Sequence, residues 1–325
     1  MTAMGVNNPP DHCVPVNVTS ASYDFTPYEF GSWDDGVASF TQTHSLGTNY
    51  NNGGPYPPGE CMTGYDNLGY ILGTSSNILA FACPKFLIES LEALHVKVWS
   101  AFLKLVDRVD NKFTKYEYAL FRNPFYQWAN AGQVKDEKTL YLVDGAGAFR
   151  NVPLHPLLQP ARNVDVIIAG DNSDGKANFL EDEMDNMPTG LSMYNTYQQS
   201  LKVGLNRMPY IPQVDVFKAQ NLTKRPVFFG CWSEKVVTIV WLPNMWYGPA
   251  TANMEDSTLA ADMPTDIVHV HKGETDKYIE NGVQIATRGG DKGWAECLGC
   301  VMMKKMGSQL PEGCDRCWQE YCYEL

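Results

Sequence analysis

The most restrictive feature of this 325-residue sequence is an apolar, strand-like run that ends on a single carboxylate. The run Leu140–Val143 is followed directly by Asp144 and Gly145. Short apolar runs of this kind are typical of buried strands. In an open α/β sheet, ligand and catalytic groups gather just outside the carboxyl ends of the strands. Asp144 is therefore a candidate general base, although Asp-Gly is also a common turn and Asp often caps the element that follows.

Strand and helix signals alternate along the rest of the chain, which predicts an α/β layered fold and a single domain or part of one. Residues 1–82 are rich in Gly, Pro, Asn and Tyr and predict loops and short strands. Buried strands are expected at Thr139–Val143, Val164–Ala169 and Val236–Leu242; helices are expected from Pro84 to about Asn111, in the second part of 181–205, at Asp276–Thr287 and in the Cys-rich tail.

The charge balance narrows the classes of partner. A net charge of −12 and a pI near 4.9 argue against nucleic acid, which needs clustered Lys and Arg, and against strong attraction to an anionic membrane surface. No apolar run approaches the ~20 residues that span a bilayer. Residues Met1–Asp11 lack the basic start and apolar core of a secretory signal peptide.

Other features nevertheless indicate an extracellular protein. Asn17 and Asn221 each begin an Asn-X-Thr glycosylation sequon. The chain has nine cysteines, and five of them fall in the last 29 residues. Because secretion requires a signal that residues 1–11 do not supply, we expect the natural N-terminus to lie upstream of Met1.

The five tail cysteines form two CxxC pairs and one further residue. The pairs are Cys297/Cys300 and Cys314/Cys317, and Cys322 follows. Two CxxC pairs can build a tetrahedral zinc site, but an extracellular compartment favours structural disulfides. We predict disulfides for all five, with zinc as the alternative, and an odd total leaves at least one cysteine without a partner in this chain.

Other metal, cofactor and nucleophile motifs are weak or absent from the sequence. His269 and His271 have no third metal ligand nearby in the sequence, so we expect a surface strand there and not a metal site. The acidic run at 181–185 predicts a solvated face. There is no Walker A loop and no GxGxxG, so no cofactor is predicted. The GxSxG elbow of an α/β-hydrolase serine is also missing; the nearest segments, 73–77 and 190–193, lack the closing glycine.

In combination, ordered blocks of residues resemble the fungal lysophospholipase (phospholipase B) family, related to the cytosolic phospholipase catalytic domain. The resemblance runs along nearly the whole chain. Its blocks are Tyr28–Asp34, Leu46–Thr48, Cys61–Asn67, Gly73–Ser76, Leu142–Gly145, Asn151–Leu154, Pro156–Leu157, Gln159–Pro160, Val164–Ile167 with Asp171 and Ser173, Pro243–Asn244, Glu280–Gly282 and the Cys-rich tail, 296–325.

This resemblance implies an ester hydrolase that releases fatty acid from lysophospholipids or phospholipids at a membrane or micelle surface. The family mechanism is a Ser-Asp dyad: serine attacks the acyl ester, aspartate is the general base, and an acyl-enzyme forms and is hydrolysed. A glycine-rich loop and an arginine stabilise the oxyanion. The matching aspartate here is Asp144. Since aspartate has a reference pKa near ~3.9, it stays ionised in acidic surroundings where histidine is protonated.

The resemblance also implies a fold: the C-terminal half of a three-layer α/β/α catalytic domain, spanning 1–325, with a secreted or cell-wall location in the full-length family. The family usually has a second glycine and an acidic residue after the Asp-Gly pair, where this chain has Ala146–Phe149. The half with the serine, the oxyanion loop and the arginine is expected to be absent. The alternatives are an inactive paralogue that binds lipid, and an extracellular structural or zinc-binding module.

Overall fold

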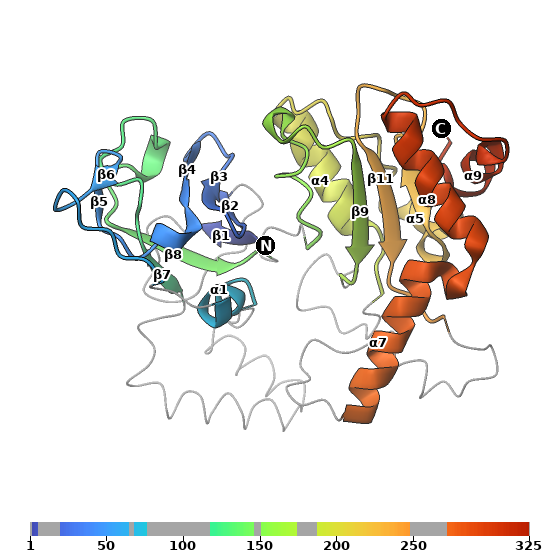
Figure 1. The fold of residues 1–325 in the computed structure, drawn as a ribbon, viewed down its shortest axis with the longest axis horizontal. Coiled ribbons are helices and arrows are strands. Elements are labelled where there is room, and N and C mark those ends of the chain that lie inside the picture. Colours follow the sequence, from blue (N-terminus) through green and yellow to red (C-terminus); the bar gives the residue numbers. More distant parts are fainter. Residues whose placement is uncertain are drawn as a thin grey trace. The chain divides into compact units, whose positions relative to one another are not determined.

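The computed structural model describes residues 2–5, 20–64, 68–76, 118–145, 151–173, 187–247 and 272–324. Contacts among the residues divide the chain into two compact units, Met1–Phe149 and Arg150–Leu325. The elements of both units are labelled in Figure 1. A single catalytic domain over 1–325 stays a prediction.

The first unit is built on a six-stranded sheet in which every neighbouring pair is antiparallel. The order is β4-β3-β2-β1-β8-β7, so β8 lies between β1 and the edge strand β7. The strands are β1 (Thr2–Gly5), β2 (Ser22–Phe25), β3 (Glu29–Ser32), β4 (Ser39–Gln42), β7 (Ala119–Arg122) and β8 (Thr139–Asp144); a ribbon of β5 (Tyr50–Asn51) and β6 (Gly54–Pro55), the helix α1 (Leu68–Thr74) and the short 3-10 turns η1 (Thr43–Ser45) and η3 (Gly132–Val134) complete the unit.

An aromatic cluster forms the core on one face of this sheet. Phe30 is fully buried, and its ring lies 4.7 Å from that of Phe25 and 6.1 Å from that of Phe121. Leu140 and Leu142 of β8 join the same cluster. Because successive strand residues alternate between faces, these leucines fix which side of β8 faces the core.

The second unit has a three-stranded sheet of mixed direction. Strand β11 (Thr238–Pro243) pairs in parallel with β9 (Val166–Asp171) and antiparallel with β10 (Val227–Phe229). Its helices are α4 (Leu191–Lys202), α5 (Val214–Ala219), α7 (Lys272–Thr287), α8 (Lys292–Lys305) and α9 (Cys314–Tyr321), with 3-10 turns η5 (Pro160–Arg162), η6 (Leu222–Lys224) and η7 (Arg288–Gly290).

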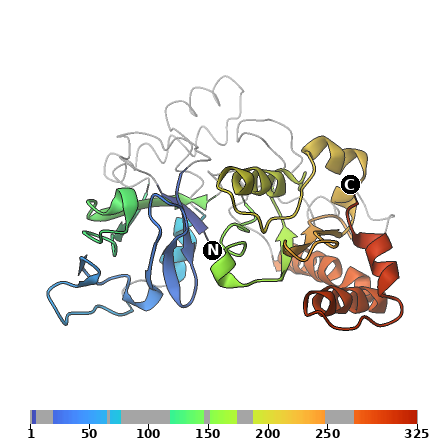
Figure 2. The same ribbon diagram turned by 90° about the horizontal axis from the view of Figure 1, so that it is seen from above.

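Helices cover both faces of this small sheet. On one face, Trp241 of β11 packs with Met193 of α4 and Phe217 of α5. On the other face, Val240 packs in a cluster with Trp294 of α8 and with residues of α7 and α9. Figure 1 shows β9 and β11 between α4 and α8, and Figure 2 shows the same separation from above. All six residues of β11 are buried, which explains the apolar sequence that follows Thr238.

The predicted mixture of strands and helices is confirmed, with shifts at the boundaries. The three strong strand signals correspond to β8, β9 and β11, and the helix expected at Asp276–Thr287 begins earlier, at Lys272. However, β8 and β9 belong to different sheets, and β8 is antiparallel to both neighbours. The helix expected at 84–111, the histidine pair and the acidic run lie outside the described residues. No described helix is long and apolar enough to cross a bilayer.

All five tail cysteines lie in disulfides. Cys297 is bonded to Cys317, and Cys300 to Cys314, which ties α8 to α9. These bonds engage the four sulfurs that a zinc site would need as thiolates. Among the described residues Cys61 is a free, exposed cysteine.

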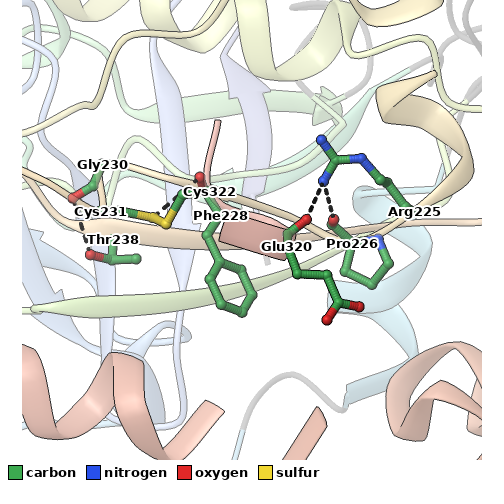
Figure 3. Close-up of a disulfide and its surroundings, with 8 residues drawn as sticks. All are labelled: Arg225, Pro226, Phe228, Gly230, Cys231, Thr238, Glu320 and Cys322. Atoms are coloured by element: carbon green, nitrogen blue, oxygen red, sulfur yellow. Dashed lines mark hydrogen bonds between the residues drawn. A yellow bond between two sulfur atoms is a disulfide. The ribbon is translucent and has the colours of Figure 1, made fainter. Parts of the chain in front are cut away.

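The third disulfide joins the C-terminal segment to the turn that follows β10. Cys231 is bonded to Cys322, 91 residues further on, as Figure 3 shows. Beside it, the Tyr323 backbone N–H donates to the Phe228 carbonyl at 2.9 Å, and the Arg225 guanidinium donates to the Glu320 carbonyl at 3.2 Å. The C-terminal segment is therefore fastened to the edge of the sheet by one covalent and several polar contacts.

Replacing both Cys231 and Cys322 by serine should lower the free energy of unfolding by about 2–5 kcal/mol, because this disulfide closes a long loop. Chemical denaturation followed by tryptophan fluorescence measures the change. Cys61→Ser is the matched control and should leave stability unchanged. Equal stability of the double variant and the control would contradict a structural role for this disulfide.

Candidate functional site

Asp144 is the last residue of β8 and is largely buried. Its relative exposure is 8%, and in the sheet register it lies opposite Ala3 of β1. By strand alternation its side chain is on the same face as Leu140 and Leu142, the face of the aromatic core. The pairing of β7 with β8 covers Leu142 but not Asp144, which lies two residues beyond it. The carboxylate therefore stands where the described strand β7 no longer flanks β8.

The glycine after Asp144 is required by close packing. A Cβ atom on Gly145 would lie 2.9 Å from the Thr2 carbonyl oxygen and 3.0 Å from Thr2 Oγ1. Such a distance to backbone means that one of the two segments would have to move. Asp-Gly is thus part of the packing of β1 against the end of β8, and it holds the backbone beside the carboxylate in place.

A cavity of about 690 Å³, wide open to the surface, lies in the same unit between α1 and β7. Gly69, Tyr70 and Gly73 line it from the helix, and Ala119 and Leu120 line it from the strand. Sequence reasoning missed this cavity. The one local signal is the pair of glycines four residues apart in a short helix, which leaves one side of that helix without side chains.

A second buried carboxylate, Asp171, ends β9 in the other unit. It is 2% exposed, and both of its oxygens are hydrogen-bonded. Oδ1 accepts from the Ser173 N–H at 2.9 Å and from Ser173 Oγ at 2.6 Å, and Oδ2 accepts from Trp241 Nε1 at 2.9 Å. Burial nevertheless raises the pKa of Asp171 above its usual value, against the lowering effect of these hydrogen bonds. With both oxygens engaged inside the fold, Asp171 fits a structural role.

Of the two predicted glycosylation sites, Asn221 lies within the described residues and Asn17 does not. Asn221 is exposed and adopts a left-handed conformation with φ 53°, immediately before η6. The next residue, Leu222, is fully buried and anchors the turn. The Asn221 side chain is therefore presented at a surface turn.

The sequence matches the lysophospholipase catalytic domain family over residues 1–324. It is 30% identical to lysophospholipase 2 of Aspergillus fumigatus over 329 residues, which cover 97% of this chain and 52% of that protein. It is 33% identical to lysophospholipase 1 of the same organism (95% and 48% covered) and 31% identical to lysophospholipase 1 of Saccharomyces cerevisiae (95% and 46% covered).

The chain belongs to the lysophospholipase catalytic domain family. The resemblance read from the sequence blocks is therefore confirmed. The chain spans about half the length of the curated relatives it matches.

The raised pKa of Asp171 predicts an unusual dependence of stability on pH. Below the ordinary value of 3.8 the carboxyl is protonated in both states and its burial imposes no ionisation penalty; the penalty grows as pH rises toward the folded-state pKa. We therefore expect the stability advantage of wild type over Asp171→Asn to be larger at pH 4 than at pH 7. Urea unfolding at both values measures it, and a larger advantage at pH 7 would contradict the direction.

Proposed function

We propose that this chain carries the general base, Asp144, of an ester hydrolase that releases fatty acid from lysophospholipids and phospholipids. The observation that supports this most is the position of Asp144, a buried strand-end carboxylate in a chain of the lysophospholipase family. The curated relatives are named lysophospholipases. Their substrate class is the basis for proposing a lipid ester here.

In the proposed mechanism, Asp144 accepts the proton of a serine hydroxyl as the serine oxygen attacks the acyl carbonyl. The carbon–oxygen bond of the ester breaks, and the departing glycerol oxygen takes up that proton from Asp144. A water molecule, which Asp144 deprotonates, then attacks the acyl-enzyme; the bond to the serine oxygen breaks, the serine oxygen takes the proton back, and the fatty acid leaves. The fixed backbone at Gly145 and Thr2 would keep the carboxylate oriented through both steps.

The serine of this dyad is proposed to come from polypeptide outside the 325 residues. The printed sequence contains no GxSxG elbow, which is the usual way for an α/β-type hydrolase to expose its serine. The oxyanion-stabilising loop and arginine would come from the same source. In that arrangement both units of this chain form part of one three-layer catalytic domain.

The same proposal places the protein outside the cell, acting at a lipid surface. Three disulfides among the described cysteines fit an oxidising compartment. Asn221 lies exposed at a surface turn, as an asparagine that accepts a glycan must. Asn17 is the second proposed acceptor.

A second candidate function is lipid binding without catalysis. The missing GxSxG favours it, because a paralogue that lost its nucleophile could keep the scaffold. The two candidates differ in whether Asp144 affects turnover once a nucleophile is supplied.

To test the base, this chain would be joined to the part of A. fumigatus lysophospholipase 1 that it does not match, and fatty-acid release from lysophosphatidylcholine would be assayed. Asp144→Asn should reduce kcat by about 10²–10⁴-fold, the usual contribution of a general base. Asp136→Asn, at an exposed carboxylate of the same unit, is the control and should be neutral. Near-normal turnover by Asp144→Asn would rule out the assignment.

The purified chain alone should release no fatty acid from lysophosphatidylcholine, because the nucleophile is proposed to come from polypeptide outside the 325 residues. Free fatty acid is quantified by mass spectrometry, with Asp144→Asn as the matched blank. Release that exceeds this blank would show that a nucleophile lies within the 325 residues.

A further inference from the structure

The two edges of the three-stranded sheet in the second unit differ in what covers them. At the β10 edge, Phe228 forms a β-bridge with Cys322, and the Tyr323 N–H donates to the Phe228 carbonyl at 2.9 Å. The disulfide between Cys231 and Cys322 holds this segment in place (Figure 3). The outer side of β10 is therefore covered by the C-terminal segment of the chain itself.

The β9 edge is open. Strand β9 pairs with β11 on one side, and no other strand in the described part of the chain lies on its other side. The carbonyls of Asp165 and Asp171 accept backbone N–H groups from the β11 side. Because alternate residues of a strand direct their backbone groups to opposite sides, the residues of the other parity direct their N–H and C=O groups outward. These residues are Val166, Ile168 and Gly170.

The sequence of β9 is that of an interior strand. Val166–Gly170 contains no charged residue and no proline, the usual means of keeping an edge strand from pairing with another strand. An uninterrupted apolar run is typical of a parallel strand that is covered on both faces, as β11 is. Yet Ile168, in the middle of β9, is 51% exposed. The strand is therefore apolar where the described structure leaves it uncovered.

Helix α7 carries further exposed apolar side chains on the same face of the sheet. Val166 and α7 pack against one core cluster, and strand alternation places Ile168 on the face of Val166. Asn172 Nδ2 donates to the Tyr278 hydroxyl at 2.6 Å, which joins the end of β9 to α7. Next to Tyr278, Ile279 is 59% exposed, and Val283, one turn further along, is 52% exposed. Exposed apolar groups gathered in this way are typical of an interaction surface.

We propose that a β-strand from polypeptide outside the 325 residues pairs with the outer side of β9 and that the segment carrying it covers Ile168. The curated relatives are long enough to supply it, since this chain covers 52%, 48% and 46% of the three compared. Pairing would satisfy the outward backbone groups of β9 and remove Ile168 from water. The inference rests on the proposed function only in assuming that this polypeptide exists, and it can be measured without turnover.

Gly170 offers a selective test. Its N–H points away from β11, so Gly170→Pro removes a donor from the outer edge and leaves the bonds with β11 intact. A Cβ atom at this position would have no other atom within 4 Å, and Gly170 is not among the residues with positive φ. Gly170→Ala is the matched control, because it adds the same Cβ atom and keeps the N–H.

Amide hydrogen exchange, resolved to single residues by mass spectrometry, is measured on the 325-residue chain and on the same chain joined to the unmatched part of A. fumigatus lysophospholipase 1. In the chain alone, the amides of Ile168 and Gly170 should exchange at least about 100-fold faster than those of Ile167 and Ala169, which bond to β11. In the joined protein they should be slowed to a similar rate. Gly170→Pro should lower the melting temperature of the joined protein by at least about 2–4 °C and leave that of the chain alone unchanged. Gly170→Ala should change neither.

Slow exchange of Ile168 and Gly170 in the chain alone would show that the edge is already covered and would overturn the proposal. Fast exchange of both amides in the joined protein would overturn it as well. If light scattering shows the chain alone to be a dimer that Gly170→Pro separates, the edge pairs with a second copy and the proposal is rejected.

The strand pairing and the proposed base fail independently. Protection of the outer β9 amides in a joined protein that keeps full turnover as Asp144→Asn would reject the base alone. Lost turnover in Asp144→Asn without protection of these amides would reject only the strand pairing.

Discussion

The pairing of β8 with β1 on one side and β7 on the other is the constraint on which the first unit depends. It places Leu140 and Leu142 in the aromatic core, sets Asp144 at the end of the same face, and requires glycine at 145 so that Thr2 can approach. The same pairing sets Ala119, in the cavity wall, two residues from the position opposite Asp144. A slip of one residue in this register would turn the carboxylate to the other face of the sheet.

In the second unit, a buried hydrogen bond and disulfides stabilise the packing around a fully buried strand, β11. Asp171 anchors Trp241 through a buried hydrogen bond at the end of β9. Two disulfides join α8 to α9, and a third joins the C-terminal segment to Cys231, just after β10. Cation–π contacts of Lys304 with Trp232 and Trp318, at 4.4 and 4.7 Å, add to this packing. These contacts stabilise the packing of the second unit.

Features that depend on neighbouring residues could be predicted from the sequence, whereas features that depend on residues far apart in the chain could not. The strands β8, β9 and β11 and the helix at 276–287 follow from apolar patterns within a few residues, and the tail disulfides from cysteine density. Sheet membership could not be read in this way: the neighbour of Asp144 is Ala3, about 140 positions away in the sequence, and the partner of Cys322 is Cys231. The cavity depends on the distant segments α1 and β7, so only the glycine spacing hinted at it.

The central claim is that Asp144 is the general base at a site for a lipid ester. A crystal structure of the chain with a lysophosphatidylcholine analogue, in which an ether replaces the ester, tests it most directly. The account predicts that the carbon replacing the ester carbonyl faces the Asp144 carboxylate, with room for a serine oxygen between them. An analogue bound elsewhere, or bound with its ester position turned away from Asp144, would contradict it.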